Sequence, residues 1–137
     1  MIQQIFSAMD QNTLLVSILD AGTVSGRVDG SGHEEILQVS AIALSAGREI
    51  RPHEHLPAQR NTVGTQEAWV VISGSLLVEV FDLDQSLIYS GCLTPGQCMV
   101  LYRGGHRFTV QEDHTVIYEI KNGPYRGPES DSKVISN

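Results

Sequence analysis

The sequence predicts a single all-β domain, an antiparallel sandwich or barrel, from three observations. Thirteen glycines and five prolines divide the 137 residues into short apolar runs. These runs are rich in Val, Ile, Leu and Tyr, several alternate between apolar and polar side chains, and turn-forming residues separate them. No segment after residue 35 carries the 3.6-residue apolar stripe of an amphipathic helix. A hydrophobic content of 41% is enough for one core in a domain of this length.

The chain divides into three parts on this reading. Residues 1–35 are expected to form an N-terminal extension, with a short helix near 3–9 or with either a helix or an edge strand near 13–19. Residues 36–121 are expected to form the barrel, and the polar residues 122–137 a tail or a strap over it. Within the barrel, strands are predicted near residues 36–44, 68–72, 75–81, 87–93, 98–102, 108–110 and 115–121.

Charge and composition argue against several classes of protein. The net charge of −7 would repel a phosphate backbone, so we expect no nucleic-acid partner. No apolar run approaches the roughly 20 residues that span a bilayer, so we expect no membrane partner. The first basic residue is Arg27, so the N-terminus lacks the start of a signal peptide and the cytoplasm is the expected location. Cys92 and Cys98 lie in apolar stretches and are predicted to be buried free thiols.

Four residues are candidates for a metal site. In a strand, side chains alternate between faces, so His53 and His55 would point the same way and could grip one ion. Glu67 opens the next apolar run, and on a neighbouring strand its carboxylate would reach the same point. Two His and one carboxylate leave open positions for a substrate or for oxygen. His106, after the Gly104-Gly105 turn, is expected to add a fourth ligand. The alternative is that these histidines only make hydrogen bonds to neighbours or water.

The spacing of these residues resembles the two motifs of the cupin family. Five residues separate Gly47 from His53, and six separate Glu67 from Gly74, as in the first motif. The second motif is matched by Pro95-Gly96, the apolar run 98–101, Gly104-Gly105 and His106. The resemblance implies a double-stranded β-helix, or jelly-roll barrel, in one domain. The eleven residues between His55 and Glu67 exceed the family's usual gap and are predicted to form a loop at the barrel mouth, either a lid or a plain surface loop.

Residues around the motifs suggest a ligand. Arg51, two positions before His53, and Arg103 are candidates for binding an anionic small molecule, although paired surface arginines are an equal alternative. Trp69, two positions after Glu67, is expected to face inward, as a sugar-binding wall or as core.

Residues of the last predicted strand are candidates for proton transfer. Glu119 and Lys121 share one face of this strand. Either of them acts as acid or base if that face lines the lumen, whereas a solvent-exposed salt bridge is the preferred alternative. Tyr118 is a weaker acid–base candidate on the other face.

The ending of the chain, residues 119–125, is similar to a subgroup of small cupins, some associated with cell-surface polysaccharide biosynthesis. The resemblance therefore implies a homodimer that holds one divalent metal ion, Zn, Fe, Ni or Mn, and binds or isomerises a sugar or sugar nucleotide. A non-haem metal dioxygenase and a non-catalytic binding or sensing protein are the two alternatives.

Overall fold

The computed structural model describes residues 1–135, and almost all of its regular structure is β-strand. A 3₁₀ turn (η1, Ala21–Thr23) and one short helix (α1, Pro128–Asp131) are the exceptions within these residues. The strands are β1 (Ile2–Phe6), β2 (Leu14–Asp20), β3 (Arg27–Asp29), β4 (Ser40–Ile42), β5 (Glu67–Ser73), β6 (Leu76–Phe81), β7 (Leu87–Leu93), β8 (Gln97–Leu101), β9 (Gly105–Val110) and β10 (Val116–Lys121).

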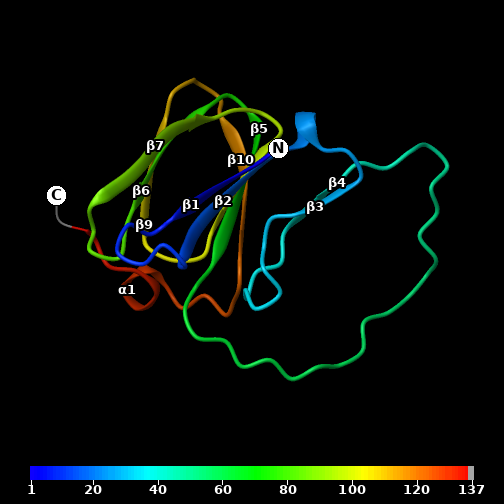
Figure 1. Cartoon of the computed structure of the whole chain (residues 1–137), viewed down its shortest axis with the longest axis horizontal. Helices are drawn as coiled ribbons and strands as arrows, with labels where there is room; N and C mark the ends of the chain where they lie inside the picture. Colours follow the sequence, from blue (N-terminus) through cyan, green and yellow to red (C-terminus); the bar gives the residue numbers. More distant parts are fainter. Residues whose placement is uncertain (136–137) are drawn as a thin grey trace.

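Two antiparallel sheets face each other in the body of the molecule (Figure 1). The larger sheet has the order β1-β2-β8-β5-β10, and the smaller one has the order β7-β6-β9. A two-stranded hairpin of β3 and β4 forms a third, separate sheet. The prediction of an all-β, antiparallel fold is therefore confirmed.

Alternating side chains of the two sheets build the core between them. Trp69 and Val71 of β5 meet Leu76, Val78 and Met99, and all five are at most 1% exposed. The opposite face of the larger sheet is also buried at its centre, because residues 37–41 cover it there. The middle strands are thus apolar on both faces, which fixes their position in the sheet.

The N-terminal part of the chain is more central than the sequence predicts. Residues 2–6 and 14–20 are strands, so neither of the helices considered there forms. β2 lies between β1 and β8 and is not an edge strand. Its residues from Leu15 to Leu19 are all buried, which requires strands on both sides and layers on both faces.

Residues 43–65 leave the body as a long excursion, seen at the right of Figure 1. We call this segment the arm. It contains no strand, and every residue in it is exposed. Before it, the strand predicted at 36–44 is reduced to β4. After it, the chain re-enters the body at Gln66, which is buried and accepts a hydrogen bond from the Leu37 backbone N–H at 2.9 Å.

The two cysteines differ from the prediction that both are buried. Both are free thiols, but Cys92 is exposed, because it lies on β7 at the margin of the smaller sheet. Cys98 is partly covered in the larger sheet, and burial raises the pKa of its thiol to about 11.

The C-terminal residues cross one end of the body and include α1. The last two residues of the predicted tail lie outside the described residues. Within residues 1–135, no helix has the length and apolar character needed to cross a membrane.

Candidate functional site

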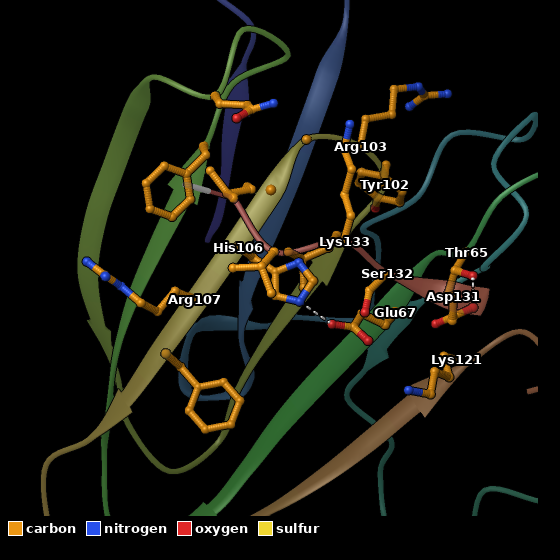
Figure 2. Close-up of a pocket in the computed structure, with 18 of the residues that line it drawn as sticks. Thr65, Glu67, Tyr102, Arg103, His106, Arg107, Lys121, Asp131, Ser132 and Lys133 are labelled. Carbon is orange, nitrogen blue, oxygen red and sulfur yellow. Dashed lines mark hydrogen bonds and ion pairs between the residues drawn. The ribbon is translucent and has the colours of Figure 1, made fainter. Parts of the chain in front are cut away.

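A cavity of about 830 Å³ opens between the two sheets (Figure 2). Side chains of β5 and β10 line it from the larger sheet, and side chains of β9 line it from the smaller one. Residues 131–135 of the C-terminal segment border it as well. Cavities of this size accommodate small organic ligands.

Glu67 and His106 meet in this cavity. Nε2 of His106 lies 2.7 Å from Oε1 of Glu67, and the Glu67 side chain is only 12% exposed. Figure 2 shows the two side chains directed toward each other from β5 and β9. The turn before His106 depends on Gly104, which has a φ of 81° and packs against the carbonyl oxygen of Phe81, so a side chain at this position would collide with the backbone. The structure thus brings together two of the four predicted metal ligands, Glu67 and His106.

Aromatic rings form the wall beside this pair. The ring of Trp69 makes edge-to-face contacts with His106 and with Phe108, each with a centroid distance of 4.9 Å. Trp69 is 1% exposed, and its indole N–H has no hydrogen-bond partner within residues 1–135. A buried indole N–H normally has a partner, and this nitrogen is itself covered by neighbouring atoms, so in this arrangement it does not reach the cavity. Trp69 is a core residue whose ring also borders the cavity.

Glu119 and Lys121 also line the cavity, so the face expected to point only to solvent borders the lumen, while the expected salt bridge between them forms. Their side chains form an ion pair of 2.9 Å between Nζ and Oε1. The hydrogen bond with Glu119 raises the pKa of Lys121. The face is set by Ile117, which packs against the core and shares its side of β10 with both charged residues. Tyr118 lies on the opposite face, is 64% exposed and does not line the cavity, contrary to its prediction as an acid–base residue of the pocket.

The arginines near the cavity are largely neutralised. Nη1 of Arg103 donates a hydrogen bond to Oε1 of Glu35 at 2.8 Å, and Figure 2 shows the Arg103 guanidinium directed away from His106. Nε of Arg107 donates to Oε2 of Glu79 at 2.6 Å, and this hydrogen bond lowers the pKa of Glu79. Arg103 and Arg107 are therefore paired with acidic residues, as in the alternative to ligand binding. Lys133 lines the cavity and makes no ion pair within the described residues.

His53, His55 and Arg51 lie in the arm and do not line the cavity. The alternation considered for His53 and His55 requires a strand, and this segment forms none, because no neighbouring strand pairs with it. The two imidazoles are close to each other, with ring centroids 5.5 Å apart, and Nδ1 of His53 lies 2.9 Å from the carbonyl oxygen of Arg51.

The predicted four-residue metal set is therefore divided into two pairs. Across residues 1–135, no three His, Cys, Asp or Glu side chains converge as metal ligands. Nε2 of His106 is moreover occupied by Glu67. As placed, this donor set does not fit a metal ion.

Two features of the cavity are missing from the sequence prediction. Phe108 is one, although its alternation with His106 along β9 places both on the inner face. The other is the contact of the C-terminal segment with the arm's end, where Oγ1 of Thr65 donates to Oδ1 of Asp131 at 2.8 Å. No local pattern connects residues so far apart in the chain.

Comparisons of the chain with protein-family models, with curated proteins and with solved structures give no match.

Proposed function

We propose that the chain is a jelly-roll protein of the cupin type that binds a sugar or sugar nucleotide between its two sheets. The observation that carries the proposal is the contact of Glu67 with His106 beside an aromatic wall, inside a cavity of about 830 Å³. The two facing antiparallel sheets and the matched motif residues around Glu67 and His106 support the cupin part of the proposal.

A sugar suits the chemistry of the lining. Phe108 offers an accessible ring for the apolar face of a pyranose, and the carboxylates of Glu67 and Glu119 offer acceptors for its hydroxyl groups. The pairing of Arg103 with Glu35 leaves little unopposed positive charge for a strongly anionic ligand. Lys133 is the cation that remains for a single phosphate or for the diphosphate of a nucleotide-linked sugar.

The Glu67–His106 pair has the composition of a proton-transfer site. A carboxylate takes a proton from the carbon next to a sugar carbonyl, and the electrons of that C–H bond move into an enolate. With protons on both ring nitrogens, His106 donates Nε2–H to Glu67 and offers Nδ1–H to the enolate oxygen. Return of the proton by Glu67 to the neighbouring carbon, with a proton moved between the two oxygens, gives an isomer. An epimer requires a second acid on the opposite face of the sugar. Neither outcome needs an oxidant or a reductant.

Binding and turnover are tested with a panel of hexoses, hexose phosphates and nucleotide-linked keto-sugars. We expect at least one member to raise the melting temperature and to exchange the hydrogen next to its carbonyl for deuterium in heavy water. Glu67→Gln and His106→Ala should each slow the exchange at least about 100-fold, the usual scale for a lost acid or base. The matched control His114→Ala, in a turn outside the cavity, should leave it unchanged. Binding without exchange would support a non-catalytic sugar-binding protein. The absence of both binding and exchange would contradict the proposal.

Metal binding is a separate proposal, because it needs the imidazoles of the arm at the cavity. We propose one divalent ion, Zn, Fe, Ni or Mn, held by His53, His55, Glu67 and His106 once the arm is docked. A dioxygenase activity would depend on the same set. The metal content of the purified chain is the test, and the double variant His53→Ala, His55→Ala should lose about one ion per chain. An equal metal content in both proteins would contradict the site.

A further inference from the structure

Two strands border the cavity with unpaired edges. Within residues 1–135, β10 pairs only with β5 and β9 pairs only with β6, so each ends its sheet. The two strands lie at the same end of the sandwich, because His106 and Phe108 of β9 contact Glu67 and Trp69 of β5, the neighbour of β10. Free backbone N–H and C=O groups along such edges are templates for another strand.

Apolar side chains are exposed along these edges. We define the open edge as Phe108 and Val110, which share the inner side of β9, with Val116, Tyr118 and Ile120, which share the outer side of β10. Their exposed fractions run from 39% for Phe108 to 64% for Tyr118. The open edge therefore combines unpaired backbone with apolar surface, and this combination is typical of an interaction site.

The arm has complementary properties. It carries four large apolar side chains without a packing partner, Leu44, Ile50, Leu56 and Val63, which are 60–95% exposed. Its three Arg and two Glu give it a charge of +1, which leaves −8 on the rest of a chain whose net charge is −7. Its 23 residues are comparable to the roughly 20–30 residues that each partner contributes to a stable interface.

We propose that the open edge of one copy of this chain docks the arm of a second copy as an added strand, and that the exchange is reciprocal. The described arrangement favours a second copy as the occupant, because each chain's own arm leaves the body on the side away from β9 (Figure 1). A two-fold axis satisfies both open edges and both arms at once, and exchanged segments are a common route to dimers. Strand addition at an exposed sheet edge supplies backbone hydrogen bonds, while the alternate side chains fill apolar positions.

The exchange would change the composition of the cavity. A strand added to β9 lies beside His106, and the alternation of side chains directs His53 and His55 of the second copy to one face of it. Each cavity is then built from two chains. The inference goes beyond the proposed sugar binding and does not rest on it.

The first test is sedimentation velocity of the full chain with a pair of matched double variants. We expect the unmodified chain to be a dimer. Val110→Lys with Tyr118→Lys, both on the open edge, should give a monomer, because two charges would be buried on docking. Met9→Lys with Leu87→Lys should stay a dimer, since these residues are similarly exposed, 65% and 53%, but neither lies on β9 or β10 or lines the cavity. A monomeric unmodified chain, or a dimeric open-edge variant, would overturn the inference.

The second test identifies the exchanged segment and covers the case in which the open-edge variant does not fold. Replacing residues 48–60 by a short Gly-Ser linker should give a folded monomer. In a Cys92→Ser, Cys98→Ser background, chains with Ile50→Cys and chains with Val110→Cys are mixed and mildly oxidised, and we expect disulfide-linked mixed dimers. A chain carrying both new cysteines that closes on itself as a monomer would contradict exchange between copies. Sugar binding is measured on the same samples, so a failed exchange and a failed function are distinguished.

Discussion

The body and the arm have opposite outcomes. Residues 67–101 contain 13 Val, Ile and Leu in 35 residues and supply much of the core, whereas the arm contains four in 23 residues and is exposed throughout. The two regions also differ in pairing. β5 has β8 on one side and β10 on the other, whereas the arm has no strand on either side within the described residues. Apolar residues therefore favour a strand, but the strand forms only where the edge of a neighbouring strand is available for pairing.

The largest difference between the two regions should appear in the loss of stability when one apolar side chain is shortened to alanine. Leu76→Ala, at a residue 1% exposed in the core, should lower the free energy of unfolding by about 2–5 kcal/mol. Val63→Ala, at an arm residue 95% exposed, should change it by less than about 0.5 kcal/mol. Urea unfolding of both variants at the same concentration, dilute enough for the chain to be monomeric and the arm undocked, measures the difference. Equal losses would show that the arm is packed as firmly as the body.

The body and the arm can also be compared by the cost of replacing a glycine that has a left-handed backbone conformation. Gly104→Ala should cost at least about 2 kcal/mol, because the left-handed conformation itself costs an alanine roughly 1–2 kcal/mol and the Phe81 carbonyl must also move. Gly47→Ala should cost the undocked monomer less than about 1 kcal/mol, since nothing lies within 4 Å of it and an undocked arm can change its φ. Thermal unfolding of the two variants gives the ranking, and a reversed order would contradict it.

A pH series compares a buried carboxylate of the body with an exposed one of the arm. Burial alone would raise the pKa of Asp82, but hydrogen bonds from Ser7 and from the backbone N–H groups of Leu83 and Ala8 outweigh it and lower the pKa below 3.8. The stabilisation is therefore present above pH 3.8 and is lost as the pH falls through the lower, folded-state pKa. Asp82→Asn should be destabilised at neutral pH, with the gap closing in acid, whereas Glu54→Gln, at an exposed residue of the arm, should change the stability at neutral pH by less than about 0.5 kcal/mol. A constant gap would show that the Asp82 charge is not responsible.

The smallest expected effect is a difference in thiol reactivity between the two cysteines of the body. The pKa of Cys98, raised to about 11 from an ordinary 9.0 by burial, reduces its thiolate fraction about 100-fold near pH 8. Cys92 is exposed on β7. A thiol reagent should therefore show one fast phase that disappears in Cys92→Ser and one slow phase that disappears in Cys98→Ser. A fast phase that survives Cys92→Ser would contradict the burial of Cys98.

The parts of the fold that depend on local pattern could be predicted from the sequence. Alternation and turn residues place the strands near 67–73, 76–81, 87–93 and 116–121. The central position of β2 could not be predicted, because a strand buried on both faces loses the alternation that distinguishes it from a short buried helix.

The candidate site was predictable only in part, for a similar reason. Glu67, Trp69 and His106 meet as expected, since each begins or follows a clear strand. The sequence of β10 alone does not show whether the Glu119 side chain points into the cavity or into solvent. That orientation depends on Ile117, which lies on the same face of β10 and packs against a core built from distant residues. For His53 and His55, the sequence motif is present but the expected site is not formed, because no neighbouring strand pairs with the segment that carries them.

The most direct test of the proposed binding site is a nitrogen-15 NMR spectrum of the histidine side chains, recorded as the tightest-binding sugar of the panel is added. The account predicts that the His106 ring signals move in proportion to occupancy, while those of His33 and His114, outside the cavity, stay in place. A sugar that binds without moving the His106 signals, or that moves those of His33 or His114 instead, would place the ligand elsewhere on the molecule.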